Sequence, residues 1–188
     1  MKNVECWKSS VDRLMGGNPN GFKVRNSFCA LLDFIHREDW QGACHASSTV
    51  LYSLLAAQNI QADIYLGEVC FGNVYFDHSW VEVEGKIYDA AISNTLVRGL
   101  SFPPVFRGID LSTGQPTELR YGVPSGQGYD ANAEWIRSIS VTEYMNAFPN
   151  HPQGLFGITK LIGKSAGLRL NIAKLEKGVG SATWKERP

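Results

Sequence analysis

The chain has 188 residues, of which 44% are hydrophobic and 19% charged, and its 18 basic and 18 acidic side chains balance to a formal net charge of zero. This composition is typical of a single folded domain with a sizeable core over residues 1–188, and it excludes intrinsic disorder, collagen and coiled coils. No stretch reaches the roughly 18 apolar residues of a membrane span and the first residues lack a signal-peptide core, so we expect a cytoplasmic protein without a membrane partner, export by a specialised route being the alternative.

The charge is unevenly distributed along the chain, although it sums to zero. Residues 38–89 carry eight acidic side chains and one basic one, whereas residues 151–188 carry seven basic and two acidic ones. We interpret these segments as surfaces that complement each other within one fold; the alternative is an acidic cleft that favours cationic substrates. The basic, aromatic-interleaved stripe of nucleic-acid-binding domains is missing, so we expect no nucleic-acid partner.

The spacing of cysteine and histidine argues against metal sites and disulfide frameworks. The four cysteines are far apart, with no C-x-x-C pair, and the four histidines include no H-x-x-x-H pair. Structural zinc sites and disulfide scaffolds have denser and more regular patterns. We therefore expect neither a metal nor another cofactor.

Two helices are predicted in the first third of the chain. Apolar side chains recur at helical spacing over residues 27–37 and again over residues 43–58. Asn59 can adopt the left-handed conformation that ends such a helix, and Ile60 can pack back on it. We expect the second helix to lie against the sheet that follows.

Three strands are predicted next. Residues 62–71, 74–83 and 86–92 are rich in β-branched and aromatic side chains, and Gly72-Asn73 and Glu84-Gly85 separate them. Two-residue connections of this kind favour tight hairpins. The sequence therefore predicts a three-stranded antiparallel meander.

The second half of the chain has weaker signals. Proline and glycine interrupt residues 99–130 so often that we expect a long loop or insertion there, of the kind that is usually functional or mobile. Residues 133–139 suggest a strand, and a capping box at 140–143 predicts a helix that Pro149 ends. Residues 158–175 form a basic amphipathic helix candidate, weakened by two glycines, which we expect to cover the core rather than to bind a membrane.

Cys44 is the first residue that suggests chemistry. It stands at the predicted start of a helix, where free N–H groups and the positive end of the helix dipole favour a thiolate and lower the pKa of a thiol. A buried structural cysteine at a helix start is also common. Cys44 is therefore a convincing nucleophile only if suitable partners lie near it.

His78 and Asp89 supply these partners through strand geometry. A two-residue turn at 84–85 pairs Trp80 with Asp89, which places His78 and Asp89 on the same face as diagonal neighbours. Their backbones are then roughly 7–8 Å apart, a distance that two side chains can bridge. A three-residue loop would instead send Asp89 to the opposite face.

Together these residues suit nucleophilic catalysis. A thiolate at Cys44 attacks a carbonyl, the imidazole of His78 transfers the proton, and the carboxylate of Asp89 orients the ring. The backbone N–H of Cys44 is one expected oxyanion donor, and the second is the side-chain amide of Gln41 or the indole of Trp40.

Two further residues stand beside these motifs. Trp80 is a candidate wall of the substrate cleft, although an aromatic residue on a hairpin is a core residue by default. His45 directly follows the nucleophile on the helix, so we expect its ring to point elsewhere and to be structural.

Three motifs in this order resemble the transglutaminase-like cysteine enzymes. The first motif is similar to the nucleophile helix of that family and to the turn that connects this helix to a strand. It consists of Gly42-x-Cys44, Leu51, Leu55, Asn59-Ile60-x-Ala62 and Gly67. His78-Ser79-Trp80-Val81-Glu82 resembles the family's His-x-Trp-x-Glu strand, and Asp89 stands where its aspartate ends the next strand. The hairpin is especially similar to the leader-peptide proteases of lasso-peptide maturation.

The resemblance covers residues 40–92, about a quarter of the chain. Asn59 replaces the usual glycine, Ala46 stands where an acid is often found, and the interval between histidine and aspartate is short, as in a tight hairpin. Nothing before residue 40 or after about residue 95 matches the family, so the resemblance does not identify the substrate.

This resemblance implies an α+β fold with a papain-like core, in which the nucleophile helix packs on an antiparallel sheet. It implies acyl transfer through a thioester, and we expect a thiol protease or amidase that hydrolyses an amide bond of a peptide or protein substrate. A protein glutamine deamidase or transglutaminase is the alternative within the same chemistry. A binding module that keeps the fold without catalysis is the alternative from another class, and a coenzyme-linked acetyltransferase is disfavoured because no nucleotide-binding feature is present.

Overall fold

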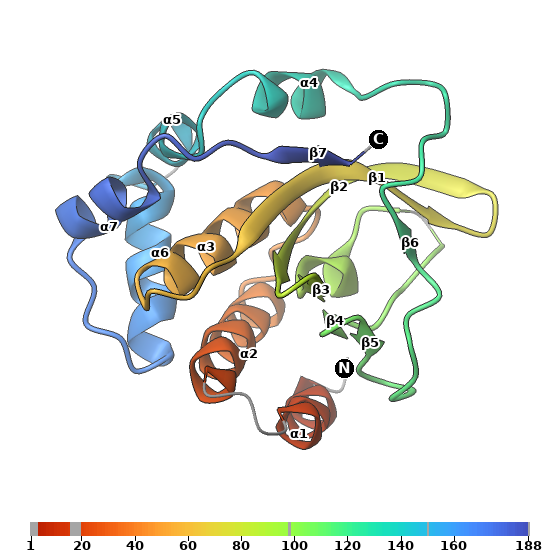
Figure 1. Cartoon of the computed structure of the whole chain (residues 1–188), viewed down its shortest axis with the longest axis horizontal. Coiled ribbons are helices and arrows are strands. Elements are labelled where there is room, and N and C mark those ends of the chain that lie inside the picture. The colour runs from red at the N-terminus through yellow and green to blue at the C-terminus, as the bar shows by residue number, and fades with distance from the viewer. Residues whose placement is uncertain (1–3, 16–19, 98, 150, 188) are drawn as a thin grey trace.

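The computed structural model describes residues 4–15, 20–97, 99–149 and 151–187, and it shows a mixed α+β fold (Figure 1). The first part of the chain forms three α-helices, then three strands and a short 3₁₀ helix. In order these are α1 (Val4–Leu14), α2 (Gly21–Arg37), α3 (Cys44–Ala56), β1 (Asp63–Phe71), β2 (Val74–Val83), β3 (Lys86–Asp89) and the short 3₁₀ helix η1 (Ala91–Asn94). The second part contributes β4 (Val105–Phe106), β5 (Ile109–Asp110), β6 (Arg120–Tyr121), α4 (Ala131–Arg137), α5 (Val141–Ala147), α6 (Gly154–Ser165), α7 (Ile172–Val179) and β7 (Lys185–Arg187).

The sheet is mostly antiparallel, and β1 and β2 form its long central hairpin. Its strand order is β5-β4-β3-β2-β1-β6, and β7 pairs in parallel with β1. On the β3 side, the pairing of β2 is confined to residues 81–83. In the part of the chain that the structure describes, no strand pairs with residues 74–80 of β2 on that side, so the edge of the strand is open there.

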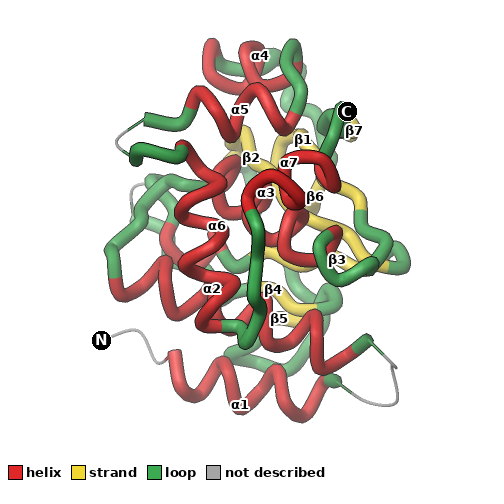
Figure 2. Tube along the Cα trace, turned by 90° about the vertical axis from the view of Figure 1, so that its left-hand side faces the viewer, coloured by secondary structure: helices red, strands yellow, loops and turns green. Residues whose placement is uncertain are grey.

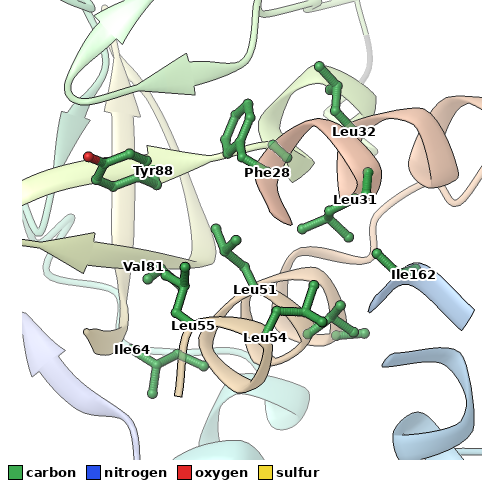
Figure 3. Close-up of a cluster of buried hydrophobic side chains, with 14 of the residues drawn as sticks. Phe28, Leu31, Leu32, Leu51, Leu54, Leu55, Ile64, Val81, Tyr88 and Ile162 are labelled. Atoms are coloured by element: carbon green, nitrogen blue, oxygen red, sulfur yellow. The ribbon is translucent and has the colours of Figure 1, made fainter. Parts of the chain in front are cut away.

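Helices α2 and α3 pack on one face of the sheet and build the main core with it. Figure 3 shows Leu51 of α3 between Phe28 of α2 and the strand residue Val81, and Leu55 beside Val81 and Ile64. A second, smaller apolar cluster lies on the other face around Trp80 and contains Val69, Ile92, Phe102, Val105 and Leu119. Figures 1 and 2 place α1 and α4 at opposite ends of the molecule.

The hairpin register agrees with the sequence-based prediction. Val83 pairs with Lys86, and the next pairs continue with the same sum of residue numbers. Both turn residues, Glu84 and Gly85, adopt positive φ angles, of 53° and 69°. This is the geometry that a two-residue hairpin loop requires, and it fixes which side chains share a face.

Helix α3 also follows its prediction. It begins at Cys44 and ends at Ala56, and Asn59 adopts a left-handed conformation with a φ of 57°. The N–H of Ile60 donates to the carbonyl of Leu55, and the Ile60 side chain is buried. This hydrogen bond ends the helix and directs the chain back toward the core, where β1 begins.

Of three predictions for the second half of the chain, one was wrong, one was incomplete and one is confirmed. Residues 133–139 do not form a strand but belong to helix α4, because the Asp130 side chain accepts hydrogen bonds from the first turn and Ala133 and Ile136 are buried at helical spacing. The amphipathic segment 158–175 is divided between α6 and α7, and Gly167 between them has a φ of 82°. The capping box at Ser140 is confirmed at the start of α5.

The segment 99–130 is largely irregular, as expected, but it is not only a loop. It provides three two-residue strands, β4, β5 and β6, which extend the sheet at both edges. Strands of two residues have no periodicity that a sequence pattern could reveal. Their position in the sheet depends instead on the longer strands beside them.

Some side chains of the acidic segment 38–89 form ion pairs with side chains of the basic segment 151–188. Lys185 of β7 forms an ion pair with Asp63 at 2.8 Å, and Arg187 forms one with the buried Glu82 at 2.9 Å. These pairs agree with the interpretation of complementary surfaces. In the part of the chain that the structure describes, no helix is both long and apolar enough to cross a membrane.

Candidate active site

Cys44 stands at the first position of α3 and at the open edge of β2. The preceding Gly42 has a φ of 66°, and its N–H donates to the carbonyl of Asn94 in η1, which holds the approach to the helix in place. The N–H of Cys44 has no acceptor within the helix because it belongs to the first turn. The cysteine is partly exposed and lines a cavity.

His78 and Asp89 form the hydrogen bond that the register predicts. The Nε2 atom of His78 donates to Oδ2 of Asp89 at 2.7 Å, and both side chains are buried. The same residue lines a cavity together with Cys44 and lowers the pKa of its thiol. Because Nε2 is engaged by the carboxylate, Nδ1 is the ring nitrogen left for an interaction with the sulfur.

The Asp89 carboxylate has two further donors. The backbone N–H of Ile92 donates to Oδ1 at 3.1 Å, and the hydroxyl of Tyr121 donates to Oδ2 at 2.8 Å. These bonds fix the carboxylate while it orients His78. Burial and the neighbouring carboxylate raise the pKa of Tyr121 well above its usual value, so this hydroxyl keeps its proton.

The sequence analysis missed Tyr121. It lies in β6, beside β1, and the chain returns there only after more than thirty residues without a regular pattern. Nothing in its neighbourhood in the sequence indicates that its hydroxyl reaches Asp89.

The electrostatics of the site favour a charged pair. Burial by itself raises the pKa of the Cys44 thiol, but the rings of His45 and His78 outweigh burial and hold that pKa well below the usual thiol range. Burial also lowers the pKa of His78, yet Asp89 and Cys44 together raise it to about 10. At neutral pH these shifts favour a thiolate at Cys44 beside an imidazolium at His78.

His45 does not point away from the site, so the expectation for it was wrong. Its ring helps to lower the pKa of the Cys44 thiol, and its Nδ1 atom lies 2.7 Å from the hydroxyl oxygen of Ser79 on β2. The ring is buried and lines the same cavity as Cys44. Cys44 therefore has two imidazole neighbours, one from its own helix and one from the sheet.

The cavity above Cys44 has a volume of about 330 Å³. One part of its wall is apolar and contains Phe76, Leu96 and Val97. Another part carries carboxylates: Asp77 accepts the backbone N–H of Asp130 at 2.7 Å, and burial together with nearby acidic groups raises the pKa of Asp77. The cavity can thus hold a mixed polar and apolar group next to the thiol.

The other residues singled out from the sequence lie elsewhere. The amide of Gln41 donates to the carbonyl of Thr95 at 3.3 Å, and the Trp40 ring packs edge-on against Phe34 and Phe148. None of the three residues Gln41, Trp40 and Trp80 lines the cavity.

Trp80 belongs to the core on the face of β2 that carries His78. Its indole stacks on Tyr65 and donates to the Glu82 carboxylate at 3.0 Å. This agrees with the default expectation for an aromatic residue on a hairpin.

A larger cavity of about 670 Å³ lies along α6 and the segment that leads to α7. It is lined by basic and apolar side chains, among them Lys160, Lys164 and Leu168, but by no cysteine, serine or threonine. The smaller cavity is therefore the better candidate for chemistry. Within the described ranges, no three His, Cys, Asp or Glu side chains are grouped so that they could hold a metal ion.

Comparison with known proteins finds no match for this chain, whether with family models, with curated proteins or with solved structures.

Proposed function

We propose that this protein is a cysteine-dependent acyl-transfer enzyme that hydrolyses an amide bond of a peptide or protein substrate. The observation that carries the proposal is the hydrogen bond from His78 to Asp89 beside a cavity that His78 and Cys44 both line, where His78 helps to lower the pKa of the thiol. A binding protein has no need for a buried, hydrogen-bonded imidazole beside an activated thiol. The proposal includes a papain-like arrangement, in which the helix that carries the nucleophile lies against an antiparallel sheet.

In the first half of the proposed reaction, the Cys44 thiolate attacks the carbonyl carbon of the substrate. The negative charge moves to the carbonyl oxygen, where the N–H of Cys44 stabilises it. The His78 imidazolium then gives its Nδ1 proton to the leaving amine as the carbon–nitrogen bond breaks. This leaves a thioester on Cys44 and a neutral ring at His78.

In the second half, water is the acceptor. His78 takes a proton from water as the oxygen attacks the thioester, and the collapse of the second tetrahedral intermediate releases the acid and restores the thiolate. Asp89 stabilises the charged form of His78 in both halves. Its three hydrogen-bond donors hold it in the orientation that this task requires.

The proposal is tested by comparing the rate at which iodoacetamide labels Cys44 with the rates for Cys29 and Cys70. Cys6 is exposed, so the experiment uses a Cys6→Ser background and peptide mapping by mass spectrometry. Cys29 and Cys70 are buried, and burial raises the pKa of Cys29 to about 11. We expect fast labelling of Cys44 at pH 6 and its loss in His78→Ala.

Slow labelling of Cys44 that His78→Ala leaves unchanged would contradict the proposal and favour a binding module. If Cys44 is activated, incubation with peptide mixtures distinguishes the acceptors. New peptide termini indicate hydrolysis of the main chain, release of ammonia from glutamine indicates deamidation, and linked peptides indicate a transglutaminase.

A further inference from the structure

The acylation step needs a second hydrogen-bond donor at the developing oxyanion, and neither donor suggested by the sequence lines the cavity. The Gln41 amide is engaged by Thr95, and the Trp40 ring lies among aromatic side chains away from the cavity. The N–H of Cys44 is one donor. A second must come from a group that lines the cavity beside the sulfur.

His45 meets this requirement by position. It follows Cys44 in the first turn of α3, it is only 7% exposed, and it lines the same cavity as Cys44. Negative charge that starts on the sulfur moves to an oxygen on the carbon it attacks. A donor next to the sulfur therefore lies next to the oxyanion as well.

The hydrogen bond with Ser79 fixes which nitrogen of His45 carries the proton. Ser79 is fully buried. Among the described residues, its hydroxyl forms a hydrogen bond with Nδ1 of His45, at 2.7 Å. A buried hydroxyl must donate its hydrogen, since a buried donor without an acceptor costs free energy. Ser79 therefore donates to Nδ1, and the neutral ring carries its hydrogen on Nε2.

The carbonyl of Ser79 is also held, because the Ser48 hydroxyl of α3 donates to it at 2.7 Å. This second bond ties Ser79 to the nucleophile helix. The serine is thus placed to act as a fixed donor to His45.

We propose that the Nε2–H of His45 is the second donor of the oxyanion hole. This inference rests on the proposed acyl-transfer function. The two histidines then have different tasks, set by their partners. A carboxylate accepts a hydrogen bond from His78, which moves a proton during the reaction, whereas a hydroxyl bonds to Nδ1 of His45 and directs its Nε2–H toward the oxyanion.

Two reactions of the same cysteine test the proposal. Alkylation by iodoacetamide displaces iodide and forms no oxyanion, whereas acylation by p-nitrophenyl acetate passes through a tetrahedral oxyanion. Both rates are measured in the Cys6→Ser background at pH values where the alkylation rate no longer depends on pH. Acylation of Cys44 is followed by nitrophenolate release and by mass spectrometry.

In His45→Ala we expect the alkylation rate to stay within about threefold and the acylation rate to fall by about 10²–10³, the typical loss for one oxyanion donor. His45→Gln presents an amide N–H at a similar reach and should recover part of this loss. Ser79→Ala should lower the acylation rate more weakly, because it frees the ring to take the other tautomer. The retained alkylation rate also shows that each variant is folded around Cys44.

Tyr144 and Gln41 provide the matched controls. Tyr144 is buried near Cys44, whose charge contributes with burial to a raised pKa of that phenol. Tyr144→Phe and Gln41→Ala should leave both rates unchanged. A selective loss of acylation in either control but not in His45→Ala would overturn the proposal.

Equal losses of both rates in His45→Ala, or no loss of either, would also overturn it. Failure of the proposed function gives a different result. In that case the parent protein itself shows no acyl group on Cys44, whatever residue stands at position 45.

Discussion

The two faces of strand β2 differ in how they hold polar groups. One face carries His78, Trp80 and Glu82, where buried charges are paired: His78 with Asp89, and Glu82 with Arg187. The other face turns toward α3, where Ser79 makes neutral hydrogen bonds and Val81 lies in the main core. The charged face is covered by the irregular segments that carry Phe102 and Leu119, whereas the neutral face lies beneath helix α3.

This difference explains how one thiol gains two distinct imidazole neighbours. The edge of β2 is open beside residues 74–80 because β3 is short, and the start of α3 lies at this edge. Adjacent side chains of a strand point to opposite faces, so His78 and the partner of His45 come from opposite sides of β2. Cys44 meets the charged face through His78 and the neutral face through His45.

Removal of His78 from the charged face should have the largest effect on the proposed reaction. His78→Ala takes away both the cation that stabilises the thiolate and the group that transfers the proton. We expect the rate of Cys44 acylation to fall by about 10⁴ or more, as for members of other catalytic triads. The p-nitrophenyl acetate assay measures this loss, and a rate within tenfold of the parent would contradict the role of His78.

Asp89→Asn should have the next largest effect. It removes the charge that raises the pKa of His78 while keeping a side chain of the same size. We expect the acylation rate to fall by about 10²–10⁴. An unchanged chemical shift titration of the His78 ring by NMR would show that the carboxylate does not control it.

The pH dependence sharpens the same point. Acylation by an amide substrate, whose leaving amine must receive a proton, needs Cys44 deprotonated and His78 protonated, so its rate should rise with pH through the lowered thiol pKa and fall through about 10. In Asp89→Asn the pKa of His78 should drop, which moves the falling limb to lower pH. A falling limb that stays in place would mean that a group other than His78 supplies the proton.

Arg187 and Lys185 allow a matched comparison of stability. Arg187 pairs with Glu82, which is buried, whereas Lys185 pairs with Asp63 at an exposed position. Arg187→Met leaves a buried carboxylate without its cation and should lower the free energy of unfolding by about 2–3 kcal/mol. Lys185→Met should cost less than about 1 kcal/mol. Urea unfolding measures both, and equal losses would show that burial of Glu82 has no energetic consequence.

Tyr121→Phe should have the smallest effect. It removes one of three hydrogen bonds to Asp89 and keeps the ring that packs against Trp80. We expect a loss of about 1 kcal/mol in the free energy of unfolding. The acylation rate should fall less than in Asp89→Asn; a larger fall would give the Tyr121 hydroxyl a direct part in the reaction.

The parts of the site that could be predicted from the sequence depend on local geometry. The turn at Glu84 and Gly85 sets the strand register, and the register places His78 beside Asp89. The start of α3 at Cys44 and its left-handed end at Asn59 follow from the same kind of local signal.

The parts that could not be predicted depend on contacts between distant segments. Tyr121 reaches Asp89 only because β6 pairs with β1, and a two-residue strand has no pattern. The role assigned to His45 of α3 depends on Ser79, which lies 34 positions later in the sequence, on β2. Residues 133–139 were predicted as a strand because the apolar spacing was considered without the helix N-cap that Asp130 provides.

The most direct test of the account is the pH dependence of Cys44 alkylation by iodoacetamide in the Cys6→Ser protein and in its His78→Ala variant. The account predicts that Cys44 already reacts at its plateau rate at neutral pH in the Cys6→Ser protein, and that loss of His78 moves the rise in rate toward the pKa of an ordinary thiol. A single rise near the ordinary thiol pKa of about 8.5 in both proteins would contradict it.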